Sequence, residues 1–272
     1  MGTIDRVEGR HAFGSDPAGY HDARPAYPER VFEILQQRCA LRPGCRTFEI
    51  GPGTGICTRR LLELGASPAV VVEPDARLAD FLTKTLEPLS SVDVRVATFE
   101  RVRLPFDWFD LGASASAFHW LDERKSLHKV AQALRDGGWW AMWWNLFFPD
   151  STTDEFHRAT RFLFDNLDRS PSWGADGRPS FALDSEARIA NLRVLNRFEN
   201  VQVDIITWRV VLDTQRVMRL YATFSPLSRL RPEKRQRLLD SLAQVTDKQF
   251  GGQVEFPITT PIYTAQRQRR SH

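Results

Sequence analysis

A glycine-rich loop constrains the fold of this chain most. In "FEIGPGTGICTRRLLELG", residues 48–65, Gly51, Gly53 and Gly55 separate a short apolar run from an amphipathic stretch. Such glycines let a ligand approach the main chain without Cβ clashes, and the helix that follows presents free N–H groups. The spacing departs from the dinucleotide fingerprint, whose glycines stand at the first, third and sixth positions, and no Gly-Lys-Ser/Thr follows as in a P-loop. The loop therefore predicts a ligand site after a first strand and disfavours a nicotinamide cofactor.

Strand and helix patterns alternate around this loop. Helical patterns lie at 28–39, 56–64, 76–86 and 123–138, and strand patterns at 47–50, 68–75, 92–99, 109–118 and 139–148. After an irregular stretch with two or three helical pieces, a strand at 201–213, helices at 214–224 and 232–246, and a last strand at 255–266 follow. Alternation of this kind predicts a sheet with helices on both faces. We therefore predict a doubly wound, Rossmann-like α/β fold with a seven-stranded, mostly parallel sheet, an antiparallel last strand and a helical cap insertion.

Composition excludes several classes of protein. The 272 residues are 42% hydrophobic and 26% charged, and no apolar run approaches the roughly 20 residues that span a bilayer, so we expect a globular protein and no membrane partner. The N-terminal "MGTIDRVEGRHAF" has no apolar core, so we expect a cytoplasmic protein without a secretory signal. Cys39, Cys45 and Cys57 lack a metal-ligand spacing, which predicts reduced thiols and no metal site. The basic stretch at 228–237 has no interleaved aromatic residues, which disfavours nucleic-acid binding.

A carboxylate lies where a ribose could bind. Glu73 ends the apolar run "AVVVE", about 20 residues after the first glycine of the loop. A carboxylate at that position can accept hydrogen bonds from both hydroxyls of a ribose. The alternative is an acid that stabilises the dipole of the following helix.

At these positions the chain resembles the class I S-adenosylmethionine-dependent methyltransferases, and within them the small-molecule group that includes the trans-aconitate methyltransferases. The motifs that carry the resemblance are "YHDARPAYP" (20–28), "FEIGPGTG" (48–55), "VVVEPD" (70–75), "ATFERVRLP" (97–105) and "SASAFHWLD" (114–122). The resemblance covers residues 13–148, and nothing in the predicted cap matches the family. The resemblance implies S-adenosyl-L-methionine as the cofactor, S-adenosyl-L-homocysteine as the product and a small-molecule methyl acceptor. The predicted division is a lid at 1–30, a cofactor-binding core at 31–149, the cap at 150–195 and a C-terminal part of the core at 196–272.

The resemblance also implies a set of cofactor contacts. Glu49 and the glycine loop would lie along the methionine and ribose, Glu73 would take the ribose hydroxyls, and Thr98 with Phe99 would border the adenine. Thr98 departs from the family pattern, since many relatives have Asp there. The predicted cofactor-binding residues are Tyr20, Arg24, Glu49, Gly51, Pro52, Gly53, Thr54, Gly55, Glu73, Pro74, Thr98, Phe99, Ser114 and Ser116.

Two predictions concern the reaction itself. Residues 11–28, which include His11, are expected to form a lid that orders over the methionine when cofactor binds, and a permanently packed arm is the alternative. His119 is expected to face the reaction centre as a base or as a group that orients the acceptor, because an imidazole can titrate near neutral pH; simple packing is the alternative. The predicted substrate-binding residues are His21, Tyr27, His119, Trp120, Asn145, Phe147, Trp173 and Tyr221.

The acceptor is constrained only by the predicted cap. Methyl transfer from a sulfonium needs mainly alignment and exclusion of water, so it requires few catalytic side chains. Aromatic residues in the cap favour a small, apolar or aromatic acceptor, methylated on O, N or C. Two alternatives stay open: an RNA or protein methyltransferase, and a fold relative that binds the cofactor but catalyses a non-methylation reaction or only binds.

Overall fold

The computed structural model describes residues 2–10, 13–87, 92–147, 154–173 and 179–269. Several predicted positions lie outside these residues: His11 of the lid, Phe148 at the end of the fifth strand, and 150–153 and 174–178 of the cap.

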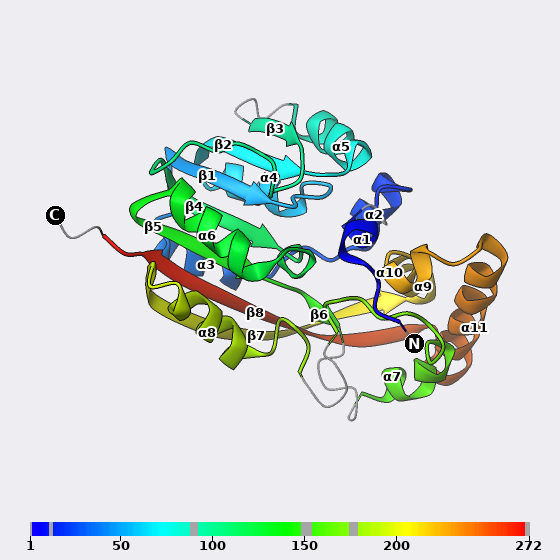
Figure 1. The fold of residues 1–272 in the computed structure, drawn as a ribbon. Helices are drawn as coiled ribbons and strands as arrows, with labels where there is room; N and C mark the ends of the chain where they lie inside the picture. Colours follow the sequence, from blue (N-terminus) through cyan, green and yellow to red (C-terminus); the bar gives the residue numbers. More distant parts are fainter. Residues whose placement is uncertain (1, 11–12, 88–91, 148–153, 174–178, 270–272) are drawn as a thin grey trace.

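A single eight-stranded sheet organises the chain (Figure 1). Its parallel part contains β1 (Cys45–Ile50), β2 (Ala66–Glu73), β3 (Val92–Val96), β4 (Phe109–Ala115) and β5 (Leu134–Trp143). Its antiparallel part contains β6 (Leu146–Phe147), β7 (Phe198–Asp213) and β8 (Gln253–Arg267). The strand order is β3-β2-β1-β4-β5-β8-β6, and β7 pairs with β8. The predicted doubly wound α/β fold with an antiparallel last strand is confirmed, and the two-residue β6 is the additional eighth strand.

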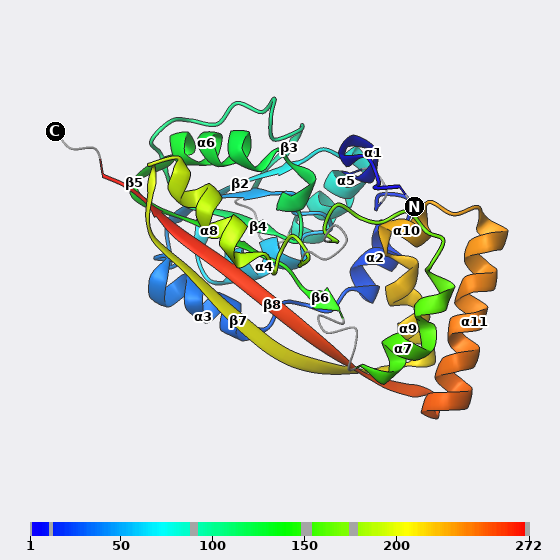
Figure 2. The ribbon, with the colours of Figure 1, turned by 60° about the horizontal axis from the view of Figure 1, so that its bottom comes forward.

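Helices cover both faces of the sheet (Figure 2). The helices α3 (Glu29–Arg38), α4 (Ile56–Glu63) and α5 (Ala76–Leu86) pack on one face, where residues such as Leu35, Leu61 and Leu82 are buried. The helices α6 (Glu123–Ala133) and α8 (Ser185–Val194) pack on the other face through residues such as Leu127 and Leu192. The burial of these side chains accounts for the apolar periodicity of the sequence.

The predicted fourth helix and fifth strand have different limits from those expected. The helix ends at Ala133, and Gly137 and Gly138 lie inside β5. A Cβ on Gly138 would stand 2.8 Å from the carbonyl oxygen of Phe109, so glycine there permits a close approach of β5 to β4, at an irregularity in their register. The strand ends at Trp143, and the backbone N–H of Asn145 donates to Ser116 Oγ at 3.4 Å. The glycines thus mark a bulge rather than a helix end.

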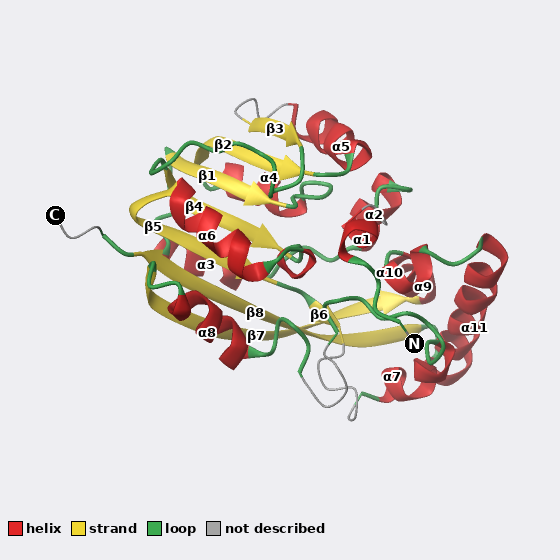
Figure 3. Cartoon of the chain, viewed as in Figure 1, coloured by secondary structure: helices red, strands yellow, loops and turns green. Residues whose placement is uncertain are grey.

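A layer of helices lies beyond the carboxyl ends of the parallel strands (Figure 3). A hydrophobic cluster joins α7 (Glu155–Thr160), α9 (Thr214–Ala222), α10 (Ser225–Ser228), α11 (Pro232–Phe250) and the far ends of β7 and β8. We call α7 and α9–α11 the cap layer. Two or three helical pieces are predicted within 150–195; of the α-helices described there, α7 belongs to this layer and α8 packs on β7 and α6 instead. The predicted limits of the cap, residues 150–195, stay a prediction. In the structure, the helices within these limits do not pack together as one group.

The N-terminal residues run between the sheet and the cap layer (Figure 1). Helix α1 (Arg6–Arg10) contacts a short 3-10 helix, η2 (Phe118–Trp120), and α2 (Pro17–Ala23) contacts both α5 and α9. A Cβ on Gly9 would lie 2.0 Å from the Trp120 ring, so this contact requires glycine. Among the described residues, no helix has both the length and the apolar character needed to cross a bilayer.

Candidate active site

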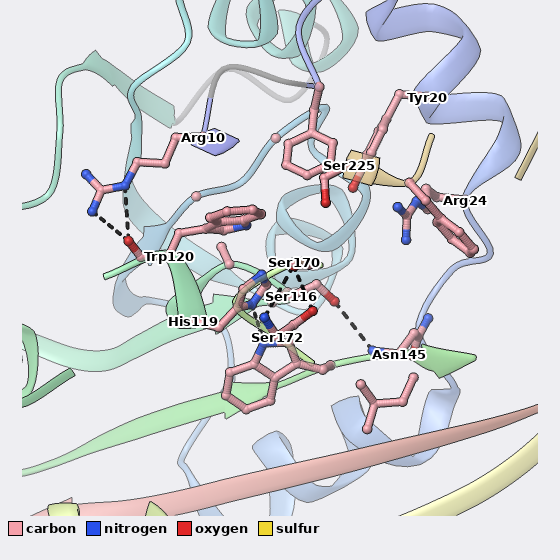
Figure 4. A pocket seen from close by; sticks show the side chains of 18 of the residues that line it. Arg10, Tyr20, Arg24, Ser116, His119, Trp120, Asn145, Ser170, Ser172 and Ser225 are labelled. Carbon is pink, nitrogen blue, oxygen red and sulfur yellow. Dashed lines mark hydrogen bonds between the residues drawn. The ribbon is translucent and has the colours of Figure 1, made fainter. Parts of the chain in front are cut away.

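A cavity of about 750 Å³ lies at the carboxyl ends of β1, β2 and β4. Its floor is the glycine loop and the ends of these strands, and its roof is the cap layer with the N-terminal residues. Figure 4 shows His119 and Trp120 on one side of it and Tyr20 and Arg24 on the other. The volume falls within the roughly 300–1,000 Å³ that is typical of small-molecule sites.

The glycine loop needs its glycines for two different reasons. Gly51 has a φ of +66°, and a Cβ on it would stand 2.5 Å from the Cβ of Ala117. Gly53 has a φ of +58°, and a Cβ added to it would meet nothing within 4 Å, so the backbone there faces open space at the cavity wall. Bare backbone at Gly53 is what a ligand that lies along the loop would require.

Glu73 ties the loop to β2. Its Oε2 accepts from the Gly53 N–H at 3.0 Å and its Oε1 accepts from the Asp75 N–H at 3.0 Å. The side chain is 3% exposed, and burial raises its pKa to about 7 although the two backbone bonds oppose the shift. Each carboxylate oxygen keeps a further lone pair, so Glu73 can accept two hydroxyl groups from the cavity.

Glu49 lies beneath the loop rather than in the cavity wall. Its Oε2 accepts from the Thr58 hydroxyl at 2.7 Å, and its buried Oε1 has no hydrogen-bond partner. Burial raises its pKa to about 7. Glu49 therefore supports the loop from below. It was expected to contact the cofactor, but it does not line the cavity.

The predicted adenine edge is only partly present at the cavity. Phe99 lines it and stacks on Phe48 with ring centroids 6.4 Å apart. Thr98 does not line it, and its carbonyl accepts from the backbone N–H groups of Arg101 and Val102. Ser114 does not line it either, because its hydroxyl points inward and donates to the carbonyl of Ile50 at 3.0 Å.

Arg24 places a positive charge in the cavity wall. Its guanidinium donates to the carbonyl of Thr223 at 3.1 Å and lies 5.0–5.1 Å from the ring centroids of Phe224 and Tyr20. Its Nε is buried without a hydrogen-bond partner, and no acidic side chain among the described residues pairs with it. A partly buried cation without an acidic partner favours an anionic ligand group at this position.

Tyr27, Ser116 and Asn145 form a connected polar group in the cavity wall. Figure 4 shows Ser116 and Asn145 of this group. The Tyr27 hydroxyl donates to Ser116 Oγ at 3.0 Å, and the same oxygen lies 3.4 Å from the Asn145 backbone nitrogen. Burial raises the pKa of the Tyr27 phenol, so it stays protonated and serves as a donor. Ser116 has a φ of +55°, a conformation that non-glycine residues adopt rarely and often at functional sites.

His119 lies in η2 and is 6% exposed. Its Nδ1 accepts from the Trp144 indole N–H at 3.0 Å. Burial lowers its pKa to about 3, and the positive charges of Arg6 and Arg24 act in the same direction. The burial of the ring does not favour titration near neutral pH, and the role of His119 as a base or as a group that orients the acceptor stays a prediction.

The roof of the cavity is aromatic with a group of hydroxyls. The aromatic residues are Phe147, Phe164, Trp173, Tyr221 and Phe224, and the serines are Ser170, Ser172, Ser180 and Ser225. The serines and two N-terminal residues that line the cavity, Arg10 and Phe13, are not among the predicted site residues. Arg10 donates to Glu100 and to the carbonyl of Trp120, so it holds α1 on η2. No local sequence pattern indicates that these serines, Arg10 and Phe13 belong to a site, because they reach the cavity only through long-range contacts.

The cavity brings most of the predicted site residues together. Those that line it are Tyr20, Arg24, Tyr27, Gly51, Pro52, Gly53, Thr54, Glu73, Pro74, Phe99, Ser116, His119, Trp120, Asn145, Phe147, Trp173 and Tyr221. Those that do not are His21, Glu49, Gly55, Thr98 and Ser114. His21 instead packs on Phe81, with ring centroids 5.5 Å apart. Within the described ranges, no group of three or more His, Cys, Asp or Glu side chains could hold a metal ion.

Comparison with known proteins points to one kind of domain. The family model described as a methyltransferase domain matches residues 48–142. An uncharacterised methyltransferase of Schizosaccharomyces pombe is 24% identical over 94% of this chain and 96% of its own length. A putative type II methyltransferase from Anaeromyxobacter dehalogenans has a similar structure, with a TM-score of 0.62, 18% identity, and coverage of 90% of this chain and 97% of that one. Phosphoethanolamine N-methyltransferase 2 of Haemonchus contortus, solved with phosphomonomethylethanolamine and S-adenosylhomocysteine, has a TM-score of 0.60 at 12% identity, covering 97% of this chain and 60% of that one.

Proposed function

Because the chain belongs to the class I S-adenosylmethionine-dependent methyltransferase family and its cofactor is S-adenosylmethionine, we propose that it methylates a small, largely apolar or aromatic molecule. The observation that carries this proposal is the continuous cavity, which joins the glycine loop and Glu73 at one end to an aromatic roof at the other. A cavity of about 750 Å³ has room for a small acceptor beside the cofactor.

The residues at the floor of the cavity fit this cofactor. The open backbone at Gly53 would run along the methionine and ribose, and Glu73 would accept the two ribose hydroxyls. Phe99 would border the adenine, and the guanidinium of Arg24, which has no acidic partner among the described residues, would bind the methionine carboxylate. In this assignment the ribose hydroxyls and the carboxylate of the cofactor meet complementary groups of the protein.

The chain contributes alignment more than acid–base chemistry. The cofactor, when bound, supplies an electrophilic methyl group on a positively charged sulfur. The protein's part is to orient the acceptor in line with that group and to keep water out. Two groups of residues orient the acceptor and exclude water. They are the N-terminal residues above the cavity and the aromatic residues Phe147, Tyr221 and Phe224.

The N-terminal residues also argue against a macromolecular acceptor. The backbone of Ile4 donates to the carbonyl of Arg169 at 2.9 Å, and Gly2 N–H binds Asp168 at 2.8 Å, so the chain start closes over the segment that lines the roof. An RNA or protein substrate would need this cover to open. A fold relative with a reaction other than methyl transfer stays as the alternative, and the assay below separates the two.

Calorimetry with S-adenosylmethionine and S-adenosylhomocysteine tests the cofactor assignment. Gly53→Val would fill the open backbone and Glu73→Ala would remove the ribose acceptor, so each variant is expected to bind at least tenfold more weakly. Gly44→Val is the matched control, because Gly44 also has a positive φ, +84°, and open space around it but lies outside the cavity. Parent-like binding by both variants would refute the assignment.

Transfer itself is tested with a methyl-labelled donor and a panel of small phenols, carboxylic acids and amines. Label in an extractable small molecule supports the proposal. Label found only in added RNA or protein, or cofactor binding without any transfer, would point to the alternatives.

A further inference from the structure

Trp144 holds the imidazole of His119 through a buried hydrogen bond. The indole Nε1–H donates to His119 Nδ1 at 3.0 Å, and Trp144 is 2% exposed. An indole nitrogen can only donate, so Nδ1 must carry a lone pair. In a neutral imidazole the proton then lies on the other nitrogen, Nε2.

The surroundings of His119 favour this neutral form. A second proton, on Nδ1, would face the indole N–H and abolish the hydrogen bond. The charged groups that bear on the imidazole are Arg6, whose guanidinium donates to the carbonyl of Leu121, and Arg24 across the cavity. Both are cations, and both disfavour an imidazolium.

The indole cannot easily turn away from His119. The Trp144 ring packs on Phe181 and Tyr263, with ring centroids 5.5 and 6.3 Å away. Phe181 is held in turn by Arg188, which lies 3.6 Å from its ring centroid, donates to its carbonyl at 2.8 Å and forms an ion pair with Glu123. Packing and hydrogen bonds thus support the Trp144–His119 bond from outside the cavity.

We propose that Trp144 is a positioning residue that fixes His119 with its proton on Nε2, so that His119 offers the acceptor a hydrogen-bond donor and not a base. This rests on the proposed function and adds the chemistry of the acceptor, which presents an anionic oxygen. The positive charge of Arg6, which is not assigned to the cofactor, favours an anionic acceptor as well. That oxygen's electron pair forms the bond to the methyl carbon, the carbon–sulfur bond breaks with its pair left on sulfur, and no proton has to leave.

Histidine-labelled ¹⁵N spectra of the full chain between pH 5 and 8 test the tautomer without any ligand. One histidine is expected to show a pyridine-type Nδ1 and a pyrrole-type Nε2 throughout this range, and His119→Gln should remove its signals. In Trp144→Phe the fixed pattern is expected to be lost, with mixed tautomers or titration. Trp140→Phe is the matched control, because Trp140 is fully buried but its indole nitrogen has no hydrogen-bond partner among the described residues.

Several outcomes would overturn the inference. An Nδ1–H tautomer or an imidazolium near pH 6 in the parent protein would do so even if Trp144→Phe failed to fold. An unchanged pattern in a folded Trp144→Phe would remove Trp144 from its role. Methylation of alkylammonium acceptors with none of ionised phenols would refute the acceptor chemistry. If the pattern is present but S-adenosylhomocysteine does not bind the parent, the proposed function fails while the positioning role stands.

Discussion

Glu49→Gln is expected to stabilise the cofactor-free protein above neutral pH. Glu49 is 1% exposed, and burial raises its pKa from 4.5 to about 7 although the Thr58 hydroxyl and the Cys57 thiol oppose the shift. Between these two values the folded chain holds a proton that the unfolded chain has lost. The free energy of unfolding therefore falls as pH rises through this window, and the stability present below pH 4.5 is gone above pH 7.

The size of this effect follows from the shift. One pKa unit corresponds to about 1.4 kcal/mol, so the buried charge costs the folded state on the order of 3 kcal/mol at pH 8. A glutamine keeps the shape and can still accept from Thr58, but it carries no charge. We expect Glu49→Gln to gain about 2–3 kcal/mol over the parent at pH 8 and close to nothing at pH 5.

Urea unfolding of the cofactor-free protein at pH 5, 6, 7 and 8 measures this difference. Glu63→Gln is a suitable control, since the Glu63 side chain is 42% exposed and should shift stability little at any pH. Equal gains for Glu49→Gln at pH 5 and pH 8 would show that packing, not the buried charge, explains the change. A loss at pH 8 would refute the reasoning altogether.

Three further predictions concern the cavity. Arg24→Met keeps much of the aliphatic side chain but removes the charge, so it should weaken S-adenosylhomocysteine binding on the order of 10- to 100-fold, as measured by calorimetry. Arg38→Met should leave this affinity unchanged, because Arg38 pairs with Asp204 outside the cavity. The affinity for S-adenosylmethionine should rise with pH and level off above about pH 7, because ribose hydroxyls bind the ionised form of Glu73. Glu73→Gln should remove this pH dependence. An affinity of the parent protein that stays constant from pH 5 to 8 would contradict the prediction. Residues 13–28 should gain protection from hydrogen exchange when S-adenosylhomocysteine binds; equal exchange in both states would favour a permanently packed arm.

The cofactor end of the site could be predicted because its parts are local. Gly51, Gly53 and Glu73 follow two apolar runs, and parallel pairing of β1 with β2 brings the ends of those runs to one edge of the sheet. The same argument holds for the alternation of strands and helices, which depends on apolar periodicity within each segment. Local sequence was sufficient wherever a role depended on the backbone path alone.

Tertiary structure decided what the side chains do. Ser114 and Ser116 are two residues apart, yet one hydroxyl is buried against Ile50 and the other lines the cavity. His119 has its proton placed by Trp144, whose position depends on the packing of β5, β8 and the segment around Phe181. Burial and hydrogen-bond partners are properties of residues brought together from distant parts of the chain, so no sequence window contains them.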